Sequence, residues 1–279
     1  MQGTIFQILV LVTHGNMVLS GQAVADFYPQ HNAFKFDEFV KFVDLEHVGN
    51  TWKEKPFAED PKDWLMKLKS QRCSGLRVER ISTDKKDISD RMSVAFVGGG
   101  GRWVIEAVCP GGSDYWEAKW EVGDRNRADQ KIWRVTYGRI ARHQKAATTN
   151  APSIDSLSAE MGRTLQDAIA FSTKHKLDWF GKAFESGYSA LRAESEPELN
   201  GIALRGQLPL PASRLLAASQ ASWVFGGMGS WNDLGFDGDD QRQYEAISDN
   251  LFRLINSSLI VTTNLSYPQA EKSWWRFWQ

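Results

Sequence analysis

Cysteine and histidine are both scarce in this chain, and their placement excludes several classes of site. The 279 residues include two cysteines, Cys73 and Cys109, too few for a disulfide framework or for a four-ligand zinc site without histidines. The five histidines are scattered, and no two are spaced i, i+4, which would place both imidazoles on one helical face. We therefore expect no cofactor and no metal held by histidine and cysteine.

An excess of charge of either sign is also missing. The chain carries 33 Lys and Arg residues against 34 Asp and Glu residues, so no overall field draws it onto nucleic acid or an anionic membrane. Nucleic-acid binding is not indicated. The hydrophobic content of 42% is typical of a folded globular protein and excludes a disordered one.

The apolar run at residues 5–12 is followed by Ala23-Val24-Ala25, which resembles a signal-peptidase site, but other features argue against an export signal. No Lys or Arg precedes the run, Gln7 interrupts it, and it is too short to cross a bilayer. We interpret it as half of a β-hairpin, with strands at residues 4–13 and 17–23 around a turn at residues 14–16. The sequence thus predicts no membrane span and a cytoplasmic location.

Tryptophan, in contrast, is abundant, with 12 residues. Each one has to bury a large ring and find a partner for its indole N–H. We expect most of them in the core, which would then be built from large aromatic plates.

The middle of the chain predicts an antiparallel meander. Trp116, Ala118, Trp120 and Val122 alternate with charged residues, which places the two sets on opposite faces of one strand. Short polar turns separate this strand from its neighbours. Further strands are expected at residues 39–45, 76–81, 92–97, 102–109 and 132–140, with one short helix beginning at Asp60 and Pro61.

Beyond residue 153 the apolar period changes from strand-like to helical. Four helices are expected, at residues 157–172, 177–191, 213–225 and 244–258. The chain is therefore predicted to be α+β, with a Trp-rich, mainly antiparallel sheet region at residues 1–145 and a helical region at residues 153–279 packed on it. The two regions can be separate domains or one continuous domain.

Four consecutive glycines, Gly98 to Gly101, invite a phosphate-loop interpretation. Such a site needs a helix after the glycines and a following Lys-Ser/Thr pair. The next segment, Arg102-Trp103-Val104-Ile105, reads as a strand instead. A flexible hairpin turn is the favoured interpretation.

The segment at residues 226–240 is unusual because it combines many glycines with four aspartates and two large aromatic residues. Its carboxylates could hold a hard cation or act as a base, although the spacing does not match an EF-hand loop. A plain helix connection, with glycine ending one helix and aspartate capping the next, explains the composition equally simply. If the segment is a ligand site, its residues are Trp231, Asn232, Asp233 and Asp237.

The polar face of the sheet carries opposed charges: Glu106, Glu117, Lys119, Glu121 and Arg134. We expect a solvated ladder of cross-strand pairs. If that face turned inward, its paired carboxylates could divide acid and base roles.

The last residues of the chain form the second candidate site. Four aromatic residues fall within five positions, namely Trp274, Trp275, Phe277 and Trp278. Such a segment can pack on its own domain, dock on a partner protein or second subunit, or sit at a membrane interface. Membrane binding usually needs a longer amphipathic helix or more positive charge. Because no catalytic signature is evident, the first functional hypothesis is a non-catalytic binding or accessory protein within a larger assembly. The alternative is a hydrolase, either metal-dependent or not, with its site at residues 226–240.

Overall fold

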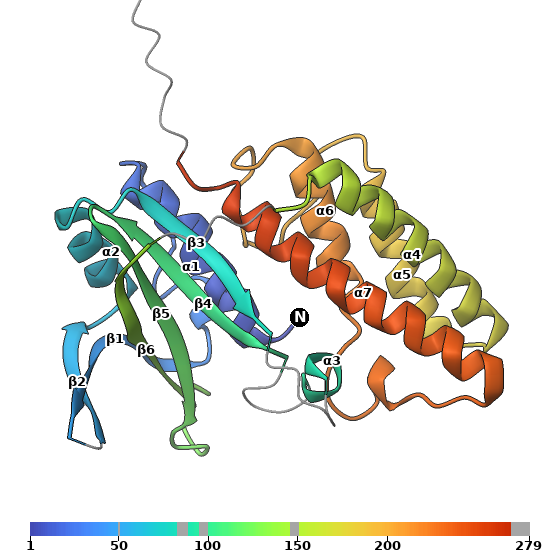
Figure 1. Cartoon of the computed structure of the whole chain (residues 1–279), viewed down its shortest axis with the longest axis horizontal. Coiled ribbons are helices and arrows are strands. Elements are labelled where there is room, and N and C mark those ends of the chain that lie inside the picture. Colours follow the sequence, from blue (N-terminus) through green and yellow to red (C-terminus); the bar gives the residue numbers. More distant parts are fainter. Residues whose placement is uncertain (50, 83–88, 95–99, 146–150, 269–279) are drawn as a thin grey trace, which may run out of the picture.

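The chain folds into a sheet with helices packed against it (Figure 1). The computed structural model describes residues 1–49, 51–82, 89–94, 100–145 and 151–268. Within these, the N-terminal half forms a six-stranded sheet and the C-terminal half is helical. The predicted α+β class with a Trp-rich sheet followed by a packed helical half is confirmed.

The sheet joins a hairpin to a four-stranded meander. Its strand order is β2-β1-β6-β5-β4-β3. All neighbours are antiparallel except β1 and β6, which run parallel, so the sheet is mixed rather than purely antiparallel. The strands are β1 (Asp37–Val48), β2 (Thr51–Ala58), β3 (Gly75–Ile81), β4 (Arg102–Cys109), β5 (Gly112–Val122) and β6 (Trp133–Gln144).

One face of the sheet, here called the covered face, packs against helices α1 (Gly3–Leu19) and α2 (Pro61–Ser70). Trp64 of α2 stacks on Phe42 with ring centroids 4.4 Å apart, and Trp116 meets both rings edge-on. Trp116 is fully buried, while Trp120 and Trp133 are half-buried at the far end of the same face. The predicted aromatic core of the meander is therefore confirmed.

Several buried indoles do not follow the expectation that each N–H finds a hydrogen-bond acceptor. The N–H groups of Trp64, Trp103, Trp116 and Trp120 have no such partner among the described residues. Trp64 and Trp116 lie edge to face, with centroids 5.8 Å apart. Ring contacts of this kind accommodate an indole edge that has no oxygen acceptor.

The predicted N-terminal hairpin is wrong: residues 3–19 form helix α1. All residues of the run at 5–12 except the half-buried Phe6 are buried, because the helix lies against the sheet and also contacts the C-terminal helix α7 (Gly238–Asn264). A helix that is apolar all round belongs in a core. A short apolar run does not distinguish such a helix from a strand, and here the surrounding packing overrode the strand preference of its β-branched residues.

The four predicted C-terminal helices are present. They are α4 (Ile154–Lys174), α5 (Asp178–Leu191), α6 (Leu210–Ala221) and α7. Helix α7 contacts α4 and α6 on one side and β3 on the other, so it joins the bundle to the sheet (Figure 1). The buried hydrophobic residues form one cluster that extends from Ile5 in α1 to Leu259 in α7. Whether the halves are separable domains stays a prediction.

A further difference lies before β4. The strand expected at residues 92–97 begins inside a short helix, α3 (Asp90–Ser93), and residues 95–99 lie outside the described part. Ser89 caps α3 by accepting a hydrogen bond from Met92 N. Asp90 is buried and pairs with Arg80, so tertiary contacts hold this turn in place. No helix in the described residues is long and apolar enough to span a membrane.

Candidate functional site

The predicted ligand loop, residues 226–240, is built around a core tryptophan. Trp231 is fully buried in the short 3-10 helix η2 (Trp231–Asp233), among rings that include Phe180 and Phe184. Its indole N–H donates to Ser248 Oγ (2.7 Å), and Tyr244 Oη donates to its carbonyl (2.5 Å). Both contacts come from α7, so Trp231 anchors the loop to that helix.

The polar residues of the loop contact other parts of the fold. Asn232 exchanges two hydrogen bonds with Arg91, donating to its carbonyl (2.8 Å) and accepting from its guanidinium (3.2 Å). Asp233 accepts a hydrogen bond from Gly229 N, and Asp237 is the N-cap residue of α7 without a side-chain capping bond. Helix α6 ends at Ala221, before the glycines, so the predicted glycine stop and aspartate cap are not found, although these contacts hold the segment as a helix connection.

The carboxylates of the loop do not converge on one another in the described contacts. Asp240 pairs with Lys174 and lies 3.4 Å from His175 Nε2, while Asp239 pairs with Arg242. Within the described ranges, no three His, Cys, Asp or Glu side chains are grouped so as to hold a metal ion. A ligand role for Trp231, Asn232, Asp233 and Asp237 stays a prediction.

The predicted partner-binding residues Trp274, Trp275, Phe277 and Trp278 lie outside the described residues. The chain approaches them along the edge of β3. The Tyr267 ring lies over the Arg77 guanidinium at 4.4 Å, and its hydroxyl is 2.6 Å from Ser74 Oγ. A side chain at Gly75 would clash with Tyr267 and Pro268, so the chain passes close to the sheet at this point.

The opposite side of the sheet, the outer face, carries the ladder of charges that the sequence predicts. Arg102 makes two hydrogen bonds to Glu117 (2.7 and 2.5 Å), and Arg134 pairs with Glu38 at 2.8 Å. Glu106 is the exception because it is only 1% exposed and accepts a bond from Ser113 Oγ (2.5 Å). Burial and the nearby Glu106 raise the pKa of Glu79 on the same face.

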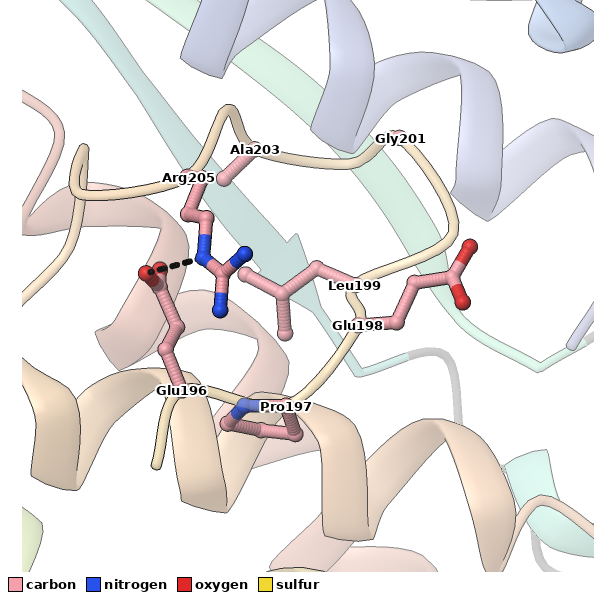
Figure 2. A pocket seen from close by; sticks show the side chains of 7 residues that line it. All are labelled: Glu196, Pro197, Glu198, Leu199, Gly201, Ala203 and Arg205. Carbon is pink, nitrogen blue, oxygen red and sulfur yellow. Dashed lines mark ion pairs between the residues drawn. The ribbon is translucent and has the colours of Figure 1, made fainter.

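A cavity of about 380 Å³ lies in the connection between α5 and α6 (Figure 2). The Glu196 carboxylate accepts bonds from Gly206 N (3.0 and 3.1 Å) and from Ser213 Oγ (3.3 Å), and Arg205 lies 3.9 Å away. With its oxygens engaged, Glu196 is a poor candidate for a catalytic base. The cavity is lined by Glu196, Pro197, Glu198, Leu199, Gly201, Ala203 and Arg205.

Two histidines of the N-terminal half contact the segment that lines this cavity. His14 and His31 each place Nε2 3.0 Å from the Gly201 carbonyl. His31 Nδ1 accepts from Ala33 N, so Nε2 carries the proton and donates to Gly201. Burial, with His31 as a lesser cause, lowers the pKa of His14 to about 4. Burial also lowers the pKa of His31, so both rings are held neutral. His14 links α1 to the helical half, and His31 links the segment before β1 to the same carbonyl.

A buried polar cluster lies where α1 meets the start of β1. Gln7 donates to Asp37 Oδ2 (2.7 Å) and to the Ala33 carbonyl (3.1 Å), and accepts from Tyr137 Oη (3.0 Å). Asp37 is 6% exposed, and burial raises its pKa to about 7. A carboxyl that titrates near neutrality can take up or release a proton. Sequence reasoning missed this cluster because Gln7 was placed in a strand; a polar residue inside an apolar run was the one available signal.

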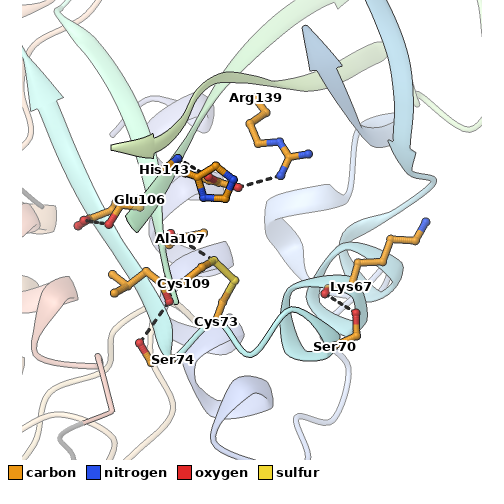
Figure 3. The surroundings of a disulfide bond; sticks show 12 residues. Lys67, Ser70, Cys73, Ser74, Glu106, Ala107, Cys109, Arg139 and His143 are labelled. Atoms are coloured by element: carbon orange, nitrogen blue, oxygen red, sulfur yellow. Dashed lines mark hydrogen bonds and ion pairs between the residues drawn. A yellow bond between two sulfur atoms is a disulfide. The ribbon is translucent and has the colours of Figure 1, made fainter. Parts of the chain in front are cut away.

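The two cysteines are joined in a disulfide, which the sequence did not predict (Figure 3). The bond links the segment before β3 to the end of β4, where Ser74 N also donates to the Val108 carbonyl (2.7 Å). Two cysteines 36 positions apart in sequence do not by themselves indicate a disulfide. They come together because β3 and β4 are neighbouring strands.

Comparison with known proteins identifies no relative: no protein-family model, no curated protein and no solved structure matches this chain. Any function has to be argued from the residues and contacts described above.

Proposed function

We propose that this chain is a non-catalytic binding or accessory protein that acts within a larger protein assembly. The observation that carries the proposal is the run of four aromatic residues at positions 274–278, directly beyond the point where Tyr267 packs on the sheet. Large aromatic rings are enriched in the centres of protein interfaces. The partner is a protein or a second copy of the chain.

The alternative, a hydrolase at residues 226–240, finds less support. Such an enzyme would use Asp233 and Asp237 to hold a cation or activate water. Asp233 instead accepts a hydrogen bond from Gly229 N, and the neighbouring Asp240 pairs with Lys174. These contacts stabilise the loop and do not favour catalysis.

The cellular compartment of the protein is also a matter of prediction. The sequence predicts the cytoplasm, and no contact in the structure tests that prediction. The bond between Cys73 and Cys109 weighs against that prediction, because structural disulfides persist in oxidising compartments and are rare in the cytosol.

The test compares the full chain with a variant that lacks residues 269–279 and with one in which the four aromatic residues are alanine. We expect both variants to lose association with a partner or with themselves and to keep the thermal midpoint of the full chain. Light scattering gives the mass, and partner capture is compared between variants. Trp179→Ala, which removes an exposed aromatic ring elsewhere, is the matched control and should change nothing. Unchanged mass together with unchanged partner capture would refute the proposal.

A further inference from the structure

The two edges of the sheet differ in how their backbone groups are satisfied. At the β3 edge, Asn16 exchanges two hydrogen bonds with the backbone of Leu76 (2.6 and 3.0 Å). Asn264 does the same with Val78 (2.7 and 3.0 Å). At the β2 edge, no hydrogen bond from an element other than β1 reaches the backbone of residues 51–56 within the described chain. Because an unpaired strand edge is a template for a further strand, β2 is the available edge.

The tip of the β1–β2 hairpin projects beyond the rest of the sheet (Figure 1). β6 pairs with β1 only as far as Asp44, so residues 45–48 and 51–54 pair only with each other. Trp52 is 63% exposed there, and its ring lies 5.0 Å from that of His47. A two-stranded ribbon alone is marginal in water, so this tip would be stabilised by a third strand.

The backbone direction along β2 follows from the hairpin connection. Only two residues separate Val48 from Thr51, which makes this the hydrogen-bonded closing pair of the hairpin. Alternation then turns the N–H and C=O groups of Trp52 and Glu54 away from β1. Pro56 belongs to the same set of residues, whose backbone groups face away from β1. Its lack of an N–H therefore removes no hydrogen bond to β1. The usable edge is therefore short and centred near Trp52.

Charge disfavours two registers for pairing of this edge with itself. An antiparallel pair centred on Lys53 places Lys53 opposite its own copy, and one centred on Glu54 does the same with Glu54. Like charges directly opposite each other are destabilising. A pair centred on Trp52 instead places the two indoles together and Thr51 opposite Lys53, with no like-charged pair.

We propose that β2 pairs antiparallel with β2 of a second copy, centred on Trp52, and joins the two six-stranded sheets edge to edge. The contact is isologous, so it closes as a dimer and does not propagate. It is small, which implies weak association, and it is independent of the role proposed for residues 269–279.

Register-specific cross-linking tests the pairing. Oxidised glutathione is added to the full-length Trp52→Cys and Lys53→Cys variants, and covalent dimer is measured on non-reducing gels. Directly opposed Cα atoms lie about 5.5 Å apart, within disulfide reach, whereas residues offset by two positions lie beyond it. We therefore expect Trp52→Cys to cross-link roughly tenfold faster than Lys53→Cys. Equal rates, or faster reaction of Lys53→Cys, would overturn the register.

A proline scan of the outward edge tests the pairing without cross-linking. Glu54→Pro removes an N–H that faces the second copy and leaves the ladder to β1 intact, whereas Glu54→Thr removes the same side chain but keeps the N–H. Sedimentation of the full chain should show weak dimerisation, retained in Glu54→Thr and weakened roughly tenfold in Glu54→Pro. Absence of self-association at about 1 mM, or equal behaviour of the two variants at equal thermal midpoints, would overturn the proposal. If deletion of residues 269–279 abolished dimerisation and Glu54→Pro did not affect it, the dimer contact would lie in residues 269–279 and not in β2.

Discussion

At the scale of single residues, two buried titratable groups influence stability in opposite directions. Asp37 is held protonated to higher pH because burial raises its pKa from 3.8 to about 7. His14 is held neutral to lower pH because burial lowers its pKa from 6.5 to about 4. Between about pH 4 and 6.5 the folded chain keeps a proton on Asp37 that the unfolded chain releases, while the unfolded chain takes up a proton that His14 refuses. The two effects therefore oppose each other in that range.

The Asp37→Asn variant separates these effects. Asp37 contributes stability that is present below pH 4 and is lost as the pH rises through 7, whereas the contribution of His14 is lost as the pH falls from 6.5 to 4. Without Asp37, the free energy of unfolding should rise with pH over this range. Relative to the parent, the variant should gain about 4 kcal/mol between pH 4 and pH 8, from denaturant unfolding at each pH. Parallel pH profiles for parent and variant would show that Asp37 titrates normally. In a His14→Gln control the acid-side loss should shrink instead.

At the scale of secondary-structure elements, helix α1 contacts both the sheet and the helical half and so connects them. Residues 14–16, which resemble a turn in sequence, lie inside the helix and serve its packing. His14 contacts the helical half at Gly201, while Asn16 satisfies the β3 edge. Gly15 lets the helix approach the sheet, since a Cβ there would lie 2.6 Å from Leu76 Cδ1.

The amide that closes the β3 edge from α7 can be tested alone. Asn264→Ala leaves the N–H and C=O of Val78 without a partner, which should lower the free energy of unfolding by about 2 kcal/mol. Hydrogen exchange at the Val78 amide should accelerate more than at neighbouring core amides. Gln166→Ala, which removes one exposed hydrogen bond from helix α4 to Tyr188, is the control and should change stability by less than about 0.5 kcal/mol. Equal losses in the two variants would mean that the edge contact contributes little.

At the scale of the whole molecule, one hydrophobic cluster and one covalent bond hold distant segments together. The cluster includes α1, the covered face of the sheet and α7, so the two halves share their interior. The disulfide joins Cys73 to Cys109, which are 36 positions apart. Cross-linking of this kind restricts the unfolded chain and stabilises the folded one.

Removing the disulfide should lower stability without changing the fold. The double variant Cys73→Ser and Cys109→Ser is expected to lose about 2–4 kcal/mol of unfolding free energy. A reductant should lower the thermal midpoint of the parent and leave that of the double variant unchanged. Intact mass under non-reducing conditions shows whether the two thiol hydrogens are absent. A parent with free thiols, or one insensitive to reductant, would contradict this expectation.

Local pattern was sufficient where a segment keeps an exposed polar face beside its buried one. The alternation around Trp116 and Trp120 and the helical stripe from Tyr244 to Ser258 each determined an element and its buried face. Pattern was insufficient at residues 5–12, because a segment surrounded by apolar neighbours has no polar face to reveal its period.

The sequence by itself determined the α+β class, the meander, the helical second half and the absence of a dominant charge. The tertiary structure alone decided the parallel pairing of β1 with β6, the disulfide, and the burial of Asp37 beside Gln7 and Tyr137. These features depend on which distant residues come together in space. The periodicity of a segment shows only which of its faces is buried. It does not show which distant residues cover that face.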